Sequence, residues 1–306
     1  MILNDISEAI GDTPLLRLGR YAPDAKAEIL AKLELLNPYS IKDRPVLFML
    51  RDAVERGLLE PGQSIVEATS GNTGLALAML CAVHGYRCVL VMSEMQSVER
   101  RQMLKALGAE LVLTPKEGGT RAARARAKRI ASERGAFYIG QHDNEANPGA
   151  HEATTGEELW RQTEGRIDAL VAGLGTGGTL VGVARALKPR KPTFQTIGVE
   201  PASSPFISQG IFRPHRLMGL APGFRPGVLD DDMIDEIELV SEEDAFQACR
   251  DIARTEGVVV GISSGATAVV ARRLAARPEW AGRTIVCVFC DSGQRYLSVD
   301  GLFPSA

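Results

Sequence analysis

Runs of apolar and β-branched residues alternate along this chain with longer segments of helix-forming residues. Seven runs have the length and composition of strands, at residues 28–35, 64–67, 88–92, 110–113, 169–174, 196–200 and 284–290. Four segments between them have the content of covering helices, at residues 75–83, 97–107, 120–133 and 180–187. The alternation predicts an α/β fold of parallel-rich, twisted sheets, because helices on both faces would leave such strands apolar throughout.

Length and one turn-rich stretch indicate two domains. A chain of 306 residues is long for a single domain. Ala146-Asn147-Pro148-Gly149 lies between two series of strands and helices and is rich in turn formers. We therefore expect the domain junction there.

Composition narrows the classes of protein. The chain is 45% hydrophobic and 24% charged with a net charge of −3, which is typical of a globular protein. It has no basic stripe, so nucleic acid is not expected as a partner. It also has no apolar run long enough to span a bilayer and no secretory signal, so we expect a cytoplasmic protein without a membrane partner. The four histidines have no metal-ligand spacing with the five cysteines, and we expect no metal.

The first candidate for chemistry is Lys42. It follows the turn 37–40, where Ser40 is placed to cap a helix beginning near Ile41. Taken alone, a lysine next to Asp43 and Arg44 is typical of a solvated surface. Together with the loops described next, its amine is a candidate to bond to an aldehyde.

A second loop joins the strand 64–67 to a helix expected to begin near Leu75. The first N–H groups of that helix have no acceptor within it, so an anion such as a substrate carboxylate can bind them. The loop also carries hydroxyls and one amide, from Thr69, Ser70, Thr73 and Asn72. A capped strand–helix turn would explain the serine and the glycines, but would not require the whole string.

A third, glycine-rich loop at residues 173–179 follows a strand and opens a helix, which suits close approach of the backbone to a phosphate. It also fits the G-x-G-x-x-G pattern of dinucleotide-binding folds, and Glu200 ends the next strand where a ribose-binding acid would lie. An NAD-dependent dehydrogenase is therefore an alternative. In a fourth loop, Ser263 precedes a helix expected at about 266–276, and its hydroxyl could simply cap that helix.

Taken together, these loops resemble the pyridoxal phosphate (PLP) site of the cysteine synthase (O-acetylserine sulfhydrylase) and cystathionine β-synthase family of fold type II enzymes. The resemblance covers nearly the whole chain. Besides the four loops it includes residues 10–15, Gln141, Asn147-Pro148, residues 151–156, Gly223-Phe224 and residues 291–298.

The resemblance implies a tryptophan synthase β-like fold with PLP in the cleft between two domains. Residues 36–147 would form a smaller, mobile N-terminal domain, and residues 1–35 with 148–306 a larger domain that binds the phosphate. Lys42 would hold the cofactor covalently and act as the catalytic residue. The other cofactor-binding residues would be Asn72 at the ring oxygen, Ser263 at the ring nitrogen, and Gly175, Thr176, Gly177, Gly178 and Thr179 at the phosphate. The substrate carboxylate would bind Thr69, Ser70, Thr73 and Gln141.

By the same resemblance, the expected activity is β-replacement on an activated L-serine, with O-acetyl-L-serine and sulfide giving L-cysteine and acetate. The resemblance also implies a transferase of amino-acid biosynthesis that forms a homodimer, and in some members a complex with serine acetyltransferase. Two departures from the family pattern, Met218 before Gly219 and Arg225 after Phe224, leave other choices open. These are O-phosphoserine as donor and a cystathionine or diaminopropionate-type product. A separate alternative is a catalytically inactive protein that binds an acetyltransferase, and the intact Lys42 argues against it.

Overall fold

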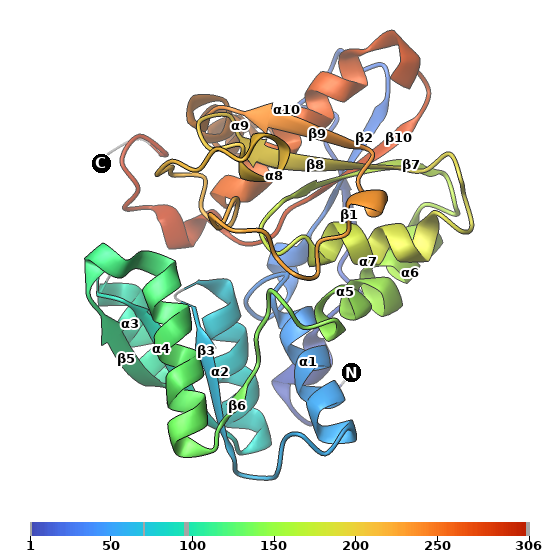
Figure 1. Ribbon diagram of the computed structural model, residues 1–306. Coiled ribbons are helices and arrows are strands. Elements are labelled where there is room, and N and C mark those ends of the chain that lie inside the picture. The colour runs from blue at the N-terminus through green and yellow to red at the C-terminus, as the bar shows by residue number, and fades with distance from the viewer. Residues whose placement is uncertain (1, 70, 95–97, 304–306) are drawn as a thin grey trace. The chain divides into compact units, whose positions relative to one another are not determined.

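The computed structural model describes residues 2–69, 71–94 and 98–303 (Figure 1). The chain divides into two compact units. The smaller unit combines the residues up to Ile10 with Asn37–Asn147, and the larger unit combines Gly11–Leu36 with the chain from Pro148 onward. The sequence prediction put residues 1–35 in the larger domain. The structure instead groups the first ten with the smaller unit, where the 3-10 helix η1 (Ile6–Ala9) contacts helix α2 (Asn72–His84).

The smaller unit contains a parallel four-stranded sheet in the order β5-β4-β3-β6. Its strands are β3 (Ser64–Ala68), β4 (Arg87–Ser93), β5 (Glu110–Thr114) and β6 (Phe137–Tyr138). Besides η1 and α2, its helices are α1 (Asp43–Glu55), α3 (Val98–Ala106), η3 (Lys116–Gly118) and α4 (Gly119–Arg134). Buried side chains of α1 and α2 pack on one face of the sheet and those of α4 on the other.

The larger unit contains a six-stranded sheet in the order β1-β2-β10-β7-β8-β9, in which only the β1–β2 pair is antiparallel. Its strands are β1 (Leu15–Arg17), β2 (Glu28–Lys32), β7 (Ile167–Gly173), β8 (Gln195–Pro201), β9 (Glu236–Val240) and β10 (Thr284–Val288). Ala169 and Val171 of β7 share a core with α9 (Glu242–Thr255) and α10 (Ile262–Ala276). The alternate residues Leu170 and Ala172 are also buried, so both faces of the sheet are covered.

The remaining helices of the chain are η2 (Glu34–Leu36), α5 (Ala146–Ala150), the π-helical turn η4 (His151–Gly156), α6 (Glu157–Gln162), α7 (Gly178–Leu187), α8 (Phe206–Gln209), η5 (Asp231–Met233), η6 (Pro278–Trp280) and η7 (Gly293–Tyr296). Helix α7 leaves the carboxyl end of β7 and packs on β7 and β8. None of the helices in the described residues is long and apolar enough to cross a membrane.

The predicted α/β fold is confirmed, and all seven predicted strands are present. Three strands were not predicted: β1 and β6 have only three and two residues, and β9 is half-buried and alternates charged with apolar residues. Residues 146–149, predicted as a turn-rich break, instead form most of α5. The predicted start of one helix, Ser97, lies outside the described residues, and α3 is described from Val98.

Candidate active site

Lys42 lies immediately before helix α1 in the smaller unit and is half-buried. The prediction that this helix begins near Ile41 was wrong by two residues, because Ser40 caps the turn before the helix. Its Oγ accepts from the backbone N–H of Lys42 at 3.1 Å, and the Asp43 carboxylate accepts from the N–H groups of Tyr39 and Ser40 at 2.7 and 3.1 Å. The turn is therefore tied to the first residue of α1, which fixes the backbone that carries Lys42.

The second loop opens α2, which begins at Asn72 rather than near Leu75. Asn72 and Thr73 therefore belong to the first turn of the helix, where backbone N–H groups lack intrahelical acceptors. Gly71 is the N-cap and adds no side-chain hydrogen bond, while the Thr69 hydroxyl accepts from the Gly71 N–H at 3.4 Å. Ser70, also predicted to bind substrate, lies outside the described residues.

Thr73 and Gln141, predicted separately from the sequence, are in direct contact. The Thr73 hydroxyl donates to Gln141 Oε1 at 2.7 Å, and both residues are buried. Asn147 Nδ2 also donates to the backbone oxygen of Gln141 at 2.7 Å. Since the amide oxygen of Gln141 is engaged by Thr73, its N–H groups are oriented to donate elsewhere, as binding a carboxylate requires.

Glu67 holds the backbone of this pair by a hydrogen bond to Gln141. It was not among the predicted site residues. It is fully buried at the end of β3, and its carboxylate accepts from the backbone N–H groups of Ala68 and Gln141 at 2.8 and 3.1 Å. Burial raises the pKa of Glu67 to about 7, although these N–H groups act in the opposite direction. An acid at the end of an apolar strand was the signal in the sequence, because a buried carboxylate needs several donors.

His142, next to Gln141, is neutral at neutral pH. Burial lowers the pKa of His142 to about 4, and the positive charges of Arg124 and Lys42 act in the same direction. Asp143 acts against them. The charge of Lys42 thus helps to lower the pKa of the buried His142 imidazole in the same unit.

In the larger unit, the third loop joins β7 to α7 and is held by close backbone contacts. A Cβ added to Gly175 would collide with the carbonyl oxygen of Gly219, and Gly177 has φ 82° and would collide with Leu229. The Thr176 hydroxyl accepts from the Gly178 N–H at 3.2 Å. The loop therefore requires glycine for steric reasons, and it presents the amino end of a ten-residue helix.

The fourth loop is brought to the third by Gly219. A Cβ added to Gly219 would lie 3.9 Å from Cβ of Ser263, while the Gly219 carbonyl faces Gly175. Helix α10 begins at Ile262 and not near Ala266, and its N-cap is Gly261. Ser263 is thus inside the first turn, and the alternative that it caps the helix is wrong.

The structure gives Glu200, the proposed ribose-binding acid, a different role. Its carboxylate is fully buried and accepts from the N–H groups of Ile207 and Ser208 at 2.7 and 2.9 Å, at the start of α8. These bonds occupy the carboxylate that a dinucleotide would need. Glu200 therefore no longer supports the dehydrogenase alternative, which keeps only the G-x-G-x-x-G pattern of the third loop.

Residues at the two departures from the family pattern are exposed. Arg225 forms an ion pair with Asp231 at 2.5 Å, in which both side chains are largely solvated. Met218 is 38% exposed and directly precedes Gly219, the residue at the junction of the third and fourth loops.

The donor set at the third loop fits the phosphate of PLP. It consists of the N–H groups of the first turn of α7, which have no acceptor within the helix, together with the buried Thr176 and Thr179, and residues 173–179 contain no acid that would repel an anion. A primary amine for the aldehyde is provided by Lys42. PLP needs donors for its phosphate and an amine for its aldehyde, and the residues that fit both needs are ones predicted from the sequence.

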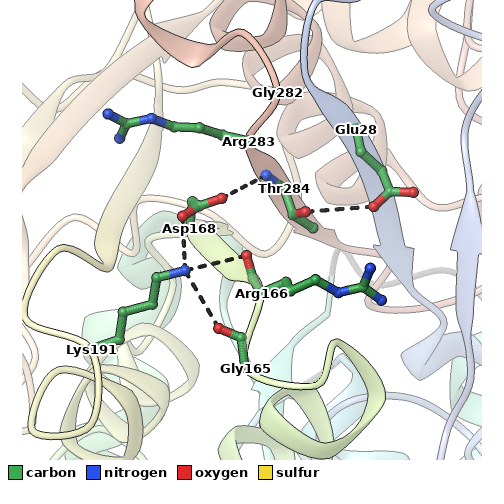
Figure 2. A pocket seen from close by; sticks show the side chains of 8 residues that line it. All are labelled: Glu28, Gly165, Arg166, Asp168, Lys191, Gly282, Arg283 and Thr284. Carbon is green, nitrogen blue, oxygen red and sulfur yellow. Dashed lines mark hydrogen bonds and ion pairs between the residues drawn. The ribbon is translucent and has the colours of Figure 1, made fainter.

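The larger unit also has a surface pocket, lined by residues outside the third and fourth loops (Figure 2). It surrounds the amino ends of β2, β7 and β10, whereas the third loop leaves β7 at its carboxyl end, roughly 20 Å away for a seven-residue strand. Asp168 at its centre accepts from Lys191 Nζ and from the Thr284 N–H, both at 2.8 Å. These charges neutralise one another, so the pocket adds nothing to the candidate site.

Comparison with known proteins identifies the family. A family profile described as pyridoxal-phosphate dependent enzyme matches residues 6–291. A cysteine synthase of Staphylococcus aureus (strain Mu50) is 45% identical over 298 residues, which cover 97% of this chain and 96% of that protein.

Comparison with solved structures gives the same family. An O-ureido-L-serine synthase superposes with a TM-score of 0.96 at 41% identity and covers 100% of this chain and 98% of that one. A cysteine synthase (OASS) from Entamoeba histolytica superposes with a TM-score of 0.95 at 37% identity, covering 100% of this chain and 93% of that one. The chain belongs to the family of pyridoxal-phosphate-dependent enzymes, and it is an enzyme of the cysteine synthase type.

Proposed function

We propose that this enzyme catalyses β-replacement on O-acetyl-L-serine with sulfide, giving L-cysteine and acetate. The observation that carries the proposal is the Thr73–Gln141 pair at the amino end of α2, backed by Glu67. It supports a site for an amino-acid carboxylate, with the N–H groups of Gln141 and of the first turn of α2 as donors. The 45% identity to a cysteine synthase supports the same substrate class.

We assign the cofactor to the residues predicted from the sequence. Lys42 would bond to its aldehyde carbon, the Asn72 amide would donate to its ring oxygen, and the Ser263 hydroxyl would contact its ring nitrogen. The phosphate would bind Gly175, Thr176, Gly177, Gly178 and Thr179. Thr69, Ser70, Thr73 and Gln141 would bind the substrate carboxylate.

The residues of the chain divide the chemistry among them. Bound PLP supplies an electron sink conjugated to the α-carbon of the amino acid. The amine of Lys42, displaced by the incoming substrate, takes the α-proton as general base. Because the hydroxyl of Ser263 is uncharged, it does not hold a proton on the ring nitrogen as a carboxylate would. An uncharged partner at that position would favour elimination of the β-substituent.

The nucleophile could differ while the residues stay the same. In O-ureido-L-serine the β-carbon carries an oxygen-linked urea group, so a β-replacement that makes it uses hydroxyurea in place of sulfide. The neighbour of that name has a TM-score of 0.96 to this chain. Met218, which directly precedes Gly219, is a departure from the cysteine synthase pattern and is the residue at which we test this second candidate.

The assembly we propose is a cytoplasmic homodimer, with serine acetyltransferase as a further partner. Both follow from the resemblance to the family. Sedimentation velocity of the purified enzyme, alone and mixed with the acetyltransferase, tests them directly.

The deciding experiment crosses donors with nucleophiles. We expect kcat/KM to be highest for O-acetyl-L-serine with sulfide, and lower for O-phospho-L-serine and for hydroxyurea. The variant Met218→Gln introduces the glutamine that, by the family resemblance, many cysteine synthases carry before this glycine, and it is the matched comparison. If hydroxyurea is preferred and Met218→Gln shifts the preference to sulfide, the second candidate replaces the first. If no pair of substrates reacts, the proposal fails.

A further inference from the structure

The π-helical turn η4 packs directly against α7, the helix that opens at the third loop. A Cβ added to Gly182 of α7 would collide with the backbone oxygen of Pro148 and lie 2.8 Å from the backbone nitrogen of Glu152. A Cβ added to Gly156 would lie 2.5 Å from that of Ala186. The two backbones are therefore in contact, and the side chains between them are held in fixed positions.

One of these side chains is His151, which is 1% exposed. Its Nδ1 lies 2.9 Å from Oγ1 of Thr155, and its Nε2 lies 3.2 Å from Oγ1 of Thr179. Thr155 is fully buried, and Thr179 is the last residue of the third loop. The imidazole thus joins a hydroxyl in the protein interior to a hydroxyl in the loop assigned to the phosphate.

The direction of these two hydrogen bonds decides what Thr179 can do. A neutral imidazole has one N–H donor and one acceptor nitrogen. If Nδ1–H donates to Thr155, then Nε2 accepts the proton of Thr179, and Thr179 has no proton left for an anion. If Thr155 donates to Nδ1, then Nε2–H donates to Thr179, whose own proton is free to point away from the ring.

We propose that His151 is a positioning residue for the cofactor phosphate: a one-way chain of donors, Thr155 to His151 to Thr179, aims the Thr179 hydroxyl proton at a phosphate oxygen. The inference rests on the proposed assignment of residues 175–179 to the phosphate. Of the two tautomers of a neutral ring, only this one leaves the Thr179 hydroxyl proton to donate to a phosphate dianion, which itself can only accept. The effect that we propose for His151 is on phosphate binding and not on the reacting atoms.

The test compares PLP with pyridoxal, which has the same ring and aldehyde but no phosphate. Dissociation constants of both are measured on the apoenzyme of the wild type and of Thr155→Val, which keeps the shape but removes the first donor. We expect PLP to bind about three- to tenfold more weakly and pyridoxal to be unchanged. The matched control is Thr154→Val, because the Thr154 hydroxyl donates to the Ala150 backbone at 2.6 Å.

Equal losses for PLP and pyridoxal in Thr155→Val would mean a general packing defect and would overturn the proposal. The variant Thr179→Val distinguishes failure of the donor chain from failure of the phosphate assignment. If Thr179→Val leaves the preference for PLP over pyridoxal unchanged, the assignment of the loop fails. If Thr179→Val lowers the preference and Thr155→Val does not, only the donor chain fails.

A second readout is independent of ligand affinity. The chain has four histidines, and the variant His151→Asn identifies the signals of His151 in nitrogen-15 spectra of the histidine-labelled enzyme. We expect a neutral ring protonated at Nε2. A ring protonated at Nδ1, or at both nitrogens, would overturn the proposed direction.

Discussion

The amino ends of α2 and α7 have the same proposed task, binding an anion, but they are built in different ways. At α2 the N-cap Gly71 has φ −104° with no atom within 4 Å of an added Cβ, and the nearby support is the buried carboxylate of Glu67. At α7 the N-cap Gly177 has φ 82° and is tightly packed, and the nearby support is the imidazole of His151.

This difference separates two ways of holding a helix end in place. The α2 end depends on hydrogen bonds to a group that titrates near neutral pH, so its geometry responds to protons. The α7 end depends on steric contact, so it tolerates no added side chain. The comparison predicts that pH perturbs the substrate site and that added volume perturbs the phosphate site.

The largest expected effect is that of Lys42→Ala, which tests whether the smaller unit carries the reacting amine. Removing a general base lowers turnover by about 10²- to 10⁴-fold, and this variant also loses the covalent link to the cofactor. Borohydride reduction of the wild type followed by peptide mapping should tag Lys42. A tag on Lys32 would contradict the assignment, since Lys32 is buried and donates to Glu158 and to the Thr13 backbone.

Next in size is Gly175→Ala, paired with Gly71→Ala in the other loop. The collision with Gly219 should destabilise the larger unit by about 1–3 kcal/mol and weaken PLP binding at least about tenfold. Gly71→Ala should change stability by less than about 1 kcal/mol. Both tryptophans, Trp160 and Trp280, lie in the larger unit, so their fluorescence during denaturant unfolding reports on the first variant. Equal effects of the two variants would break the comparison.

The pH dependence of Glu67 follows from its raised pKa. In the folded protein the pKa is about 7 against an ordinary value of 4.5, so the unfolded chain releases the proton first. The wild type therefore loses stability as pH rises from 4.5 through 7, by roughly 3 kcal/mol relative to a group that does not titrate.

The matched variant for this prediction is Glu67→Gln, which is uncharged at every pH. The stability difference between wild type and Glu67→Gln should shrink across that window and stay constant above it. Hydrogen exchange of the backbone amides of residues 64–68 and 137–141 measures this stability difference locally in the smaller unit. A difference that is independent of pH would show that Glu67 does not titrate in this range.

The smallest expected effect concerns the Thr73–Gln141 hydrogen bond. Thr73→Val removes the donor and should lower kcat/KM for the amino-acid donor about fivefold, or about 1 kcal/mol. Thr73→Ser keeps the hydroxyl and should stay within about twofold of the wild type. Equal losses in both variants would point to packing of the threonine methyl group instead.

Periodicity and composition were sufficient for the main elements of the fold. Long apolar runs such as 87–93 and 167–173 are buried on both faces, so hydrophobicity alone marks them as strands. The short or half-buried strands β1, β6 and β9 carry little such signal. The loops with glycines and hydroxyls gave nearly every candidate site residue, because anion binding at a helix end needs those residue types in consecutive positions.

The sequence by itself thus determined the α/β architecture and the candidates for the reactive lysine and for the anion-binding loops. Only the tertiary structure decided where α2 and α10 begin, because Gly74 and Gly265 are inside these helices and not at their ends. A Cβ at Gly74 would lie 3.3 Å from Leu90, and one at Gly265 would lie 2.5 Å from Sγ of Cys249. The contacts of Glu67 and His151 also come from the tertiary structure alone, because their partners Gln141 and Thr179 are distant in sequence. Local pattern records residue type and spacing, whereas burial and hydrogen bonding between distant segments arise only when the chain is packed.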